Sequence, residues 1–155
     1  MIAMNGMAHV ILTVSQWEKA HAFYSELCPF LGMAKVYDGN NFLYHVGGRT
    51  ALGIQRCAEA FSGERFQQNR VGLHHICLRA RSRPDVDQAA KFVQGLGAVI
   101  DRGPMEREWA PGYYFFVFED PDGIRLEINH IPGAGLLAGD TPLSPSDDPD
   151  WDQNP

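Results

Sequence analysis

Hydrophobic and polar positions follow the same order twice along the chain. Each of the two stretches begins with a short alternating run, at about residues 9–14 and 75–80, whose period of two is typical of a β-strand. A helix-like pattern follows, with apolar residues three and four positions apart, and it ends at a Leu-Gly pair, Leu31–Gly32 or Leu96–Gly97. Three further strand-like runs come after each helix, at about 33–38, 41–46 and 50–56 and then at about 98–101, 112–118 and 123–129.

The two stretches are copies of one unit. His9 and His75 lie 66 residues apart, and the two helix-ending glycines lie 65 residues apart. This agreement predicts an α+β fold built from two modules, each a strand, a helix and three strands (βαβββ). The predicted boundaries are about 5–57 for module one, about 58–70 for a polar linker, about 71–131 for module two and 132–155 for an acidic tail rich in Pro, Gly and Asp.

Polar residues mark the helix starts and one long connection. Ser15 and Ser82 each precede a helical pattern and have an acidic residue three positions later, which predicts a side-chain cap at both helix starts. Residues 102–112 form the longest polar connection within a module, with glycines near both ends. This segment is a candidate lid, and the alternative is an ordinary surface loop.

The formal net charge of −6 comes almost entirely from the tail, which contains five aspartates and no Lys or Arg. The nearly neutral remainder has no basic stripe, so we expect no nucleic-acid partner. No apolar run approaches the roughly 18 residues of a membrane span. The three cysteines form no C-x-x-C pair, which favours reduced thiols over a disulfide framework or a thiolate zinc site. We therefore expect a cytoplasmic protein with no membrane partner.

Alternation along the strands places three polar side chains on faces opposite to the apolar ones. They are His9 in the first strand, His75 in the fifth and Glu127 in the eighth. Two imidazoles and one carboxylate suit zinc, iron, manganese or nickel and leave positions open for water or substrate. Because the histidines are equivalent in the two copies, we predict that the three residues bind one divalent metal. Taken singly, each is more typical of a hydrogen-bonded or solvated side chain.

Several of these motifs resemble those of the vicinal oxygen chelate superfamily, which includes glyoxalase I, extradiol dioxygenases, fosfomycin-resistance enzymes and bleomycin-binding proteins. The motifs are the strand that starts at His9, the Phe23-Tyr24 pair with the later Leu31-Gly32, the strand that starts at His75 and, most specifically, the Asp120-Pro121-Asp122-Gly123 turn before Glu127. The resemblance covers about residues 7–131 and is specific for the superfamily rather than for one reaction.

The resemblance implies a single domain over residues 1–131, with a cupped mixed β-sheet and helices on its outer face. It also implies that His9, His75 and Glu127 are the metal ligands. Glu127 is in addition the candidate catalytic residue, as a general base if it leaves the metal during turnover. Glyoxalase I adds a glutamate on the fourth strand, where this chain has Gly53, so Gln55 is the candidate for an additional ligand.

The resemblance further implies a small-molecule metalloenzyme of the glyoxalase I-like type, in which a divalent metal chelates vicinal oxygens of the substrate. Two alternatives stay open. One is an Fe(II) extradiol-type ring-cleaving dioxygenase with the same three ligands, although Val117 stands where that family has a tyrosine. The other is a non-catalytic small-molecule (drug) binding or resistance protein.

Substrate contacts are expected from aromatic residues on or beside the inner strands and from one cation. The candidates are Tyr44, Trp109, Tyr114, Phe116 and Arg125. Arg125 shares a strand face with Glu127, so it could hold a substrate anion or pair with the carboxylate. We expect a small-molecule substrate and a homodimer, because exposed sheet edges invite pairing between chains, as in many relatives.

Overall fold

The computed structural model describes residues 2–4, 6–137, 139 and 142–143 and divides the chain into two compact units. Unit 1 runs as far as Phe66 and also contains Pro121–Gly123, whereas unit 2 contains Gln67–Asp120 and the chain from Ile124 onward. The five aspartates of the predicted acidic tail lie outside the described residues.

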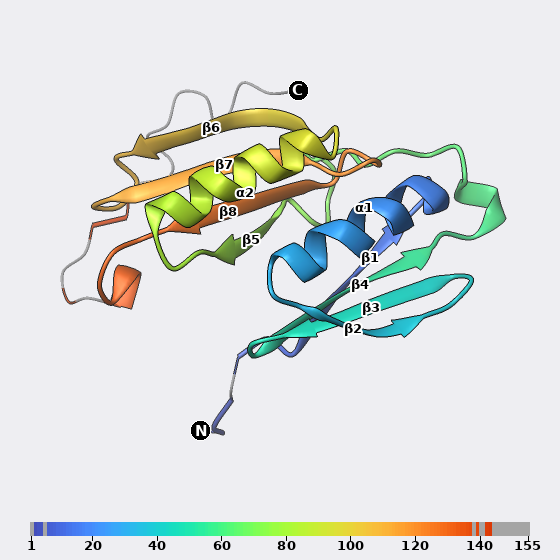
Figure 1. Cartoon of the computed structure of the whole chain (residues 1–155), viewed down its shortest axis with the longest axis horizontal. Coiled ribbons are helices and arrows are strands. Elements are labelled where there is room, and N and C mark those ends of the chain that lie inside the picture. The colour runs from blue at the N-terminus through green and yellow to red at the C-terminus, as the bar shows by residue number, and fades with distance from the viewer. Residues whose placement is uncertain (1, 5, 138, 140–141, 144–155) are drawn as a thin grey trace. The chain divides into compact units, whose positions relative to one another are not determined.

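The same order of elements occurs in both units (Figure 1). Unit 1 contains β1 (His9–Val14), α1 (Trp17–Phe30), β2 (Ala34–Asp38), β3 (Phe42–Gly47) and β4 (Thr50–Arg56), followed by the short 3-10 helix η1 (Glu59–Phe61). Unit 2 contains β5 (Ile76–Arg79), α2 (Arg83–Gly95), β6 (Val99–Arg107), β7 (Tyr113–Glu119) and β8 (Arg125–His130), followed by η2 (Gly135–Leu137). The predicted α+β class and the two βαβββ modules are confirmed.

Each unit forms its own four-stranded mixed sheet. The strand order is β1-β4-β3-β2 in unit 1 and β5-β8-β7-β6 in unit 2. In both sheets the first and last strands of the module pair in parallel, and the remaining neighbours pair antiparallel. Matching strands therefore occupy matching places, so the sequence repeat is also a structural repeat.

One face of each sheet is covered by the helix of the same unit. In unit 1, α1 packs against β2, β3 and β4. The buried side chains of this layer include Leu12, Val14, Leu43 and Ile54 from the strands and Leu27 from the helix. Burying an aliphatic side chain of this size stabilises the fold by about 1.5–3 kcal/mol. The helix therefore packs on the apolar face of the sheet, where these side chains are removed from water.

Unit 2 is built in the same way, with α2 packed against β6, β7 and β8. Phe116, Phe118 and Leu126 are fully buried, as are Val86 and Val93 of the helix. Along β8 the apolar residues that face α2 alternate with polar residues that face the other way. The sheet face away from α2 therefore carries the side chains that can bind or react. In the part of the chain that the structure describes, no helix has the length and apolar character that a bilayer span needs.

The start of α1 differs from the sequence prediction. The helix has Gln16 at its N-cap position, with no side-chain cap, and the Ser15 hydroxyl instead donates to Oδ1 of Asp122 at 2.5 Å. The Asp122 carboxylate also accepts from the backbone N–H of Ser15 at 3.1 Å and of Gln16 at 3.2 Å. An acidic side chain beside a helix N-terminus is favourable because the first N–H groups lack helical partners. At α2 the predicted cap is confirmed, since Ser82 Oγ accepts from the backbone N–H of Asp85.

The prediction that 102–112 form one loop is wrong, because β6 extends to Arg107. The strand pairs with β7 along this length, with register shifts between Ile100 and Arg102 and between Arg102 and Met105. Irregular pairing of this kind accommodates Gly103 and Pro104 in an edge strand. Only residues 108–112 connect β6 to β7, so the candidate lid is much shorter than expected.

Candidate functional site

The polar face of β8 is the centre of the candidate site. Glu127 lies opposite Cys77 of β5 and Val117 of β7 in the strand register, so these three side chains share one face of the unit 2 sheet. The Glu127 side chain is only 5% exposed. A carboxylate at this depth requires charged or hydrogen-bonding partners.

The first partner of Glu127 is His75, which comes directly before β5. His75 Nε2 lies 3.3 Å from Glu127 Oε2, and the histidine side chain is 26% exposed. One edge of the imidazole therefore reaches solvent while its Nε2 faces the carboxylate. This arrangement brings together two of the three predicted metal ligands.

The second partner is Tyr113, the first residue of β7. Its hydroxyl donates to Glu127 Oε1 at 2.6 Å and accepts from Asn129 Nδ2 at 2.8 Å. The two carboxylate oxygens thus have different roles, because Tyr113 occupies Oε1 whereas Oε2 faces His75. Glu127 and Asn129 are both buried, so Tyr113 links them in a hydrogen-bonded group that is largely shielded from solvent.

These contacts keep the carboxylate ionised. Desolvation on its own would raise the pKa of Glu127, but the hydrogen bonds from His75 and Tyr113 outweigh it and hold the pKa below its usual value. Burial and the Glu127 charge raise the pKa of Tyr113, which keeps the phenol protonated as a donor. Although Cys77 as a residue is exposed, desolvation of its sulfur and the Glu127 charge raise the pKa of its thiol, which is consequently a poor nucleophile.

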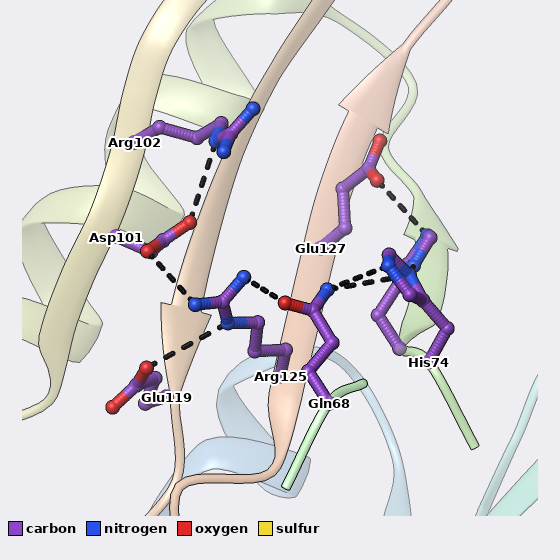
Figure 2. Close-up of polar contacts among 8 residues, drawn as sticks. Gln68, His74, Asp101, Arg102, Glu119, Arg125 and Glu127 are labelled. Atoms are coloured by element: carbon purple, nitrogen blue, oxygen red, sulfur yellow. Dashed lines mark hydrogen bonds and ion pairs between the residues drawn. The ribbon is translucent and has the colours of Figure 1, made fainter. Parts of the chain in front are cut away.

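A line of polar contacts extends from His75 through His74 and Gln68 to Arg125, and Figure 2 shows the last three of these residues. His75 Nδ1 lies 2.7 Å from His74 Nδ1, and His74 Nε2 lies 2.8 Å from the amide nitrogen of Gln68. The Gln68 carbonyl oxygen accepts from Arg125. Neither Gln68 nor His74 is among the residues that the sequence predicted for the site, and His74 contacts the site histidine directly.

Arg125 is held by two carboxylates besides Gln68. Its guanidinium lies 3.3 Å from Asp101 and 3.7 Å from Glu119, and Asp101 also pairs with Arg102 at 3.3 Å (Figure 2). Of the two roles predicted for Arg125, pairing with a carboxylate therefore occurs, but with these residues and not with Glu127. A role in holding a substrate anion stays a prediction.

An apolar cluster covers the rest of this face. Trp109 packs on Phe115 and Tyr113, with ring centroids 4.8 and 5.3 Å apart, and Val117 and Met105 complete the cluster. Trp109 is 8% exposed. The predicted substrate residue Trp109 thus stands on the same face as Glu127, in an apolar wall of the kind that surrounds small-molecule sites.

The placement expected for Tyr114 and Phe116 needs correction. Phe116 is fully buried on the α2 side of the sheet, opposite Ile128 in the register. The Tyr114 hydroxyl donates to Asp87 of α2 at 2.7 Å. Both side chains therefore lie on the face of β7 opposite to Tyr113, and neither faces Glu127.

Unit 1 contains the equivalent strand positions. His9 starts β1 as His75 precedes β5, and Ile11 pairs with Gly53 just as Cys77 pairs with Glu127. Gly53 is thus the unit 1 counterpart of Glu127. A Cβ at Gly53 would lie 2.7 Å from Ile11 and 2.8 Å from Tyr44, so side chains already fill the space where a carboxylate would stand.

His9 has aromatic neighbours. The Tyr44 ring lies edge-on to it at 6.3 Å and stacks on Phe42 at 5.7 Å. Gln55 is exposed, and its amide makes only a 3.5 Å contact with the carbonyl of Arg56. Its predicted role as an additional ligand stays a prediction.

The predicted ligands are divided between the units, with His9 in unit 1 and His75 and Glu127 in unit 2. Within the described residues, no cluster of three or more His, Cys, Asp or Glu side chains is arranged to hold a metal ion. The structure therefore establishes the His75–Glu127 pair, and the convergence of all three residues stays a prediction.

Fold and site together define a protein with paired βαβββ modules and a polar centre on the open face of a sheet. Residues 6–128 match the model of the Glyoxalase/Bleomycin resistance protein/Dioxygenase superfamily. The chain belongs to this superfamily, whose members generally use divalent metals.

Individual relatives agree with this assignment. The uncharacterised protein YqjT of Bacillus subtilis (strain 168) is 29% identical over 125 residues, which cover 79% of this chain and 96% of that protein. A crystal structure of a candidate glyoxalase from Bacillus halodurans is 28% identical, with a TM-score of 0.72 over 82% of this chain and 96% of that chain. Lactoylglutathione lyase from Agrobacterium tumefaciens shares the fold, with a TM-score of 0.62 at 20% identity over 87% of this chain and 98% of that one.

Proposed function

We propose that this protein is a metalloenzyme that acts on a small molecule with two adjacent oxygen atoms, with His9, His75 and Glu127 as metal ligands. The observation that carries the proposal is the His75–Glu127 pair, 3.3 Å apart on the sheet face that α2 leaves open. The equivalent position of His9 in the repeat supports the third ligand.

The donor set fits a divalent metal. Imidazole nitrogen and carboxylate oxygen are ligands for zinc, iron, manganese and nickel alike. The low pKa of Glu127 means that the carboxylate is charged at neutral pH and needs no deprotonation to bind a cation. Tyr113 holds Oε1 and so leaves Oε2, on the His75 side, as the oxygen available for a ligand bond.

A bound divalent metal supplies Lewis acidity, which polarises a substrate oxygen and stabilises negative charge that develops on it. The residues of this chain provide the rest. Glu127 would accept a proton from the substrate carbon or hydroxyl at Oε2 when that oxygen is not bound to the metal, and Tyr113 fixes the carboxylate through its hydrogen bond to Oε1. Trp109 and its apolar neighbours exclude water from the part of the sheet face next to Glu127 and Tyr113.

A specific observation favours a second candidate. Gly53 stands in unit 1 where unit 2 has the Glu127 carboxylate, and side chains of Ile11 and Tyr44 fill the space beside it. Of the two equivalent ligand positions in unit 1, only that of His9 therefore carries a side chain that can bind a metal. Two histidines and one carboxylate form the ligand set typical of non-haem iron oxygenases. An Fe(II)-dependent ring-cleaving dioxygenase is therefore the second proposal.

Metal analysis of purified, untagged protein tests both proposals. We expect about one divalent metal per chain, lost in His75→Ala and Glu127→Gln but kept in Glu59→Gln, a matched change at an exposed glutamate. Iron together with oxygen uptake on catechols would select the dioxygenase, and lactoylglutathione lyase activity, the activity named for the Agrobacterium tumefaciens protein of this fold, would select the glyoxalase-like enzyme. Tight binding of small aromatic ligands by metal-free protein, with no turnover under either assay, would show instead a binding protein.

A further inference from the structure

Two successive residues of β6, Asp101 and Arg102, place their side chains on the sheet face away from α2. Arg102 pairs with Val117 in the strand register and Val117 pairs with Glu127, so these three side chains share one face. Asp101 contacts Arg125, which stands two residues before Glu127 on that same face. The register shift just before Arg102 accounts for this, because the extra residue of a β-bulge interrupts the alternation of side chains.

The Arg102 guanidinium is held at one nitrogen and unpaired at the other two. Its Nε lies 3.3 Å from Asp101 Oδ2, and its side chain is only 16% exposed (Figure 2). Among the described residues, neither terminal nitrogen has a hydrogen-bond or ion-pair partner, and neither is enclosed by protein. The end of the guanidinium therefore reaches the open sheet face with its N–H donors unused.

Arg125, the other arginine of this face, differs in this respect. All three of its guanidinium nitrogens are engaged, Nη1 by Gln68, Nη2 by Asp101 and Nε by Glu119. An anion would have to displace one of these partners to bind Arg125. The same anion can bind the terminal nitrogens of Arg102 without breaking a contact.

We propose that Arg102 binds an anionic group of the substrate, a carboxylate or a phosphate, while the reacting end of the molecule lies at Glu127. The anion site follows from the unpaired guanidinium, whereas its part in the reaction rests on the proposed function. The two terminal nitrogens of a guanidinium present parallel N–H groups, which match two oxygens of either anion.

The strand register sets the size of the molecule that fits. Arg102 and Glu127 stand in one row, two strands apart, which is roughly 10 Å between their backbones. Val117 is the side chain between them, and its apolar surface suits the body of a small molecule. One aromatic ring with its substituents, or a short carbon chain, spans this separation. The inferred substrate is therefore a small molecule with adjacent oxygens at one end and an anion at the other.

Metal-free protein tests the anion site by itself. Benzoate, phenyl phosphate and the neutral benzamide are titrated into the wild type, and the Nε–Hε resonance of Arg102 in ¹H–¹⁵N spectra reports binding at the guanidinium. We expect at least one of the two anions to bind roughly tenfold more tightly than benzamide and to shift this resonance. The tighter anion identifies the group. An unmoved resonance, or no preference over benzamide, would overturn the proposal.

Substitutions assign the preference to a residue. Arg102→Gln should abolish it, and Lys91→Gln is the matched control, because it removes one positive charge from an exposed position of α2, which covers the opposite sheet face. A preference kept in Arg102→Gln but lost in Arg125→Gln would assign the anion to Arg125 and overturn the proposal. Melting temperatures show whether each variant is folded. Should Arg102→Gln not fold, the resonance of Arg102 in the wild type decides.

Zinc loading separates this inference from the proposed function. On zinc-loaded wild type, 3,4-dihydroxybenzoate, which has adjacent oxygens and a carboxylate, should bind roughly tenfold more tightly than 3,4-dihydroxybenzamide, and in Arg102→Gln the two should bind equally. Equal binding to the wild type would overturn the link between Arg102 and the reaction site. If the protein bound no zinc, iron, manganese or nickel while the anion preference still depended on Arg102, the anion site would stand and the proposed function would fall.

Discussion

The Tyr113 hydroxyl donates a 2.6 Å hydrogen bond to Oε1 of Glu127 and so divides the two carboxylate oxygens between an internal partner and the His75 side. Tyr113→Phe should remove this bond and leave Asn129 Nδ2 without its acceptor. We expect a loss of about 1–3 kcal/mol in the free energy of unfolding and a rise in the pKa of Glu127. Urea denaturation and carboxyl ¹³C titration measure the two effects. Tyr114→Phe, on the opposite face, is the control and should leave the Glu127 pKa unchanged.

A comparison of His75→Ala with Leu126→Ala separates function from fold. His75 is partly exposed beside Glu127, so its removal should abolish metal binding and cost the metal-free protein only about 0.5–1.5 kcal/mol, the net contribution of one hydrogen bond, because water can then reach Glu127 Oε2. Leu126 is fully buried under α2, and truncating it should cost about 2–5 kcal/mol. Thermal melts in the presence of a chelator check both values. Equal destabilisation by the two changes would contradict the face assignment of β5 and β8.

His45 should make unit 1 less stable in acid. It is 1% exposed, and desolvation, followed by the charge of Lys35, lowers its pKa below the usual 6.5. Because the unfolded chain takes up a proton near pH 6.5 and the folded protein does not, the free energy of unfolding should fall as the pH drops through that value. His45→Leu should remove this dependence. Its melting temperature should exceed that of the wild type by more at pH 5 than at pH 8, and an equal difference at both would refute the explanation.

A side chain at Gly53 would displace its neighbours. A Cβ there would meet side-chain atoms of Ile11 and Tyr44 at under 3 Å, so both side chains must shift and Gly53→Ala should cost about 1 kcal/mol. Gly63→Ala is the matched control, because no heavy atom lies within 4 Å of its Cβ position. Chemical denaturation of both variants gives the comparison.

Asp122→Ala should destabilise α1 by about 0.5–2 kcal/mol, the usual cost of losing a helix N-terminal acceptor. Asp122→Asn keeps an acceptor oxygen and should cost less. Hydrogen exchange of amides in the first turn of α1 locates the effect, and loss of protection throughout unit 2 but not in α1 would argue against this role. Glu59→Ala, at an exposed acid outside α1, serves as the control.

The repeat and the element order could be predicted because each depends on local pattern. The alternating runs and the Leu-Gly helix ends recur at nearly constant spacing, and the polar face of β8 reads directly from the alternation of Leu126, Glu127 and Ile128. Because successive side chains of a strand point to opposite faces, alternating apolar residues in the sequence show which side chains are buried.

The homodimer expected from the sheet edges depends on a second chain and stays a prediction, which light scattering would test.

The parts of the site that were missed lack such a pattern. Residues 113–118 are a continuous aromatic and apolar run, so parity could not show that Tyr113 rather than Tyr114 faces Glu127. The register between β7 and β8 identifies the face of Tyr113, since Val117 pairs with Glu127 and Tyr113 lies four residues before Val117 on the same face. His74 precedes β5, where strand alternation no longer applies, and Gln68 belongs to a connection whose path local sequence does not specify.

The place of Asp122 has a consequence for how the chain is made. A ribosome synthesises β1 to β4 long before residue 122, yet the amides of Ser15 and Gln16 find their acceptor only in the turn Pro121–Gly123, which belongs to unit 1. During translation the first amides of α1 therefore lack their carboxylate acceptor until most of the second half of the chain has been synthesised. A gene fragment that ends at residue 66 should encode a nascent-like product with a frayed α1, even though it contains every strand of its sheet.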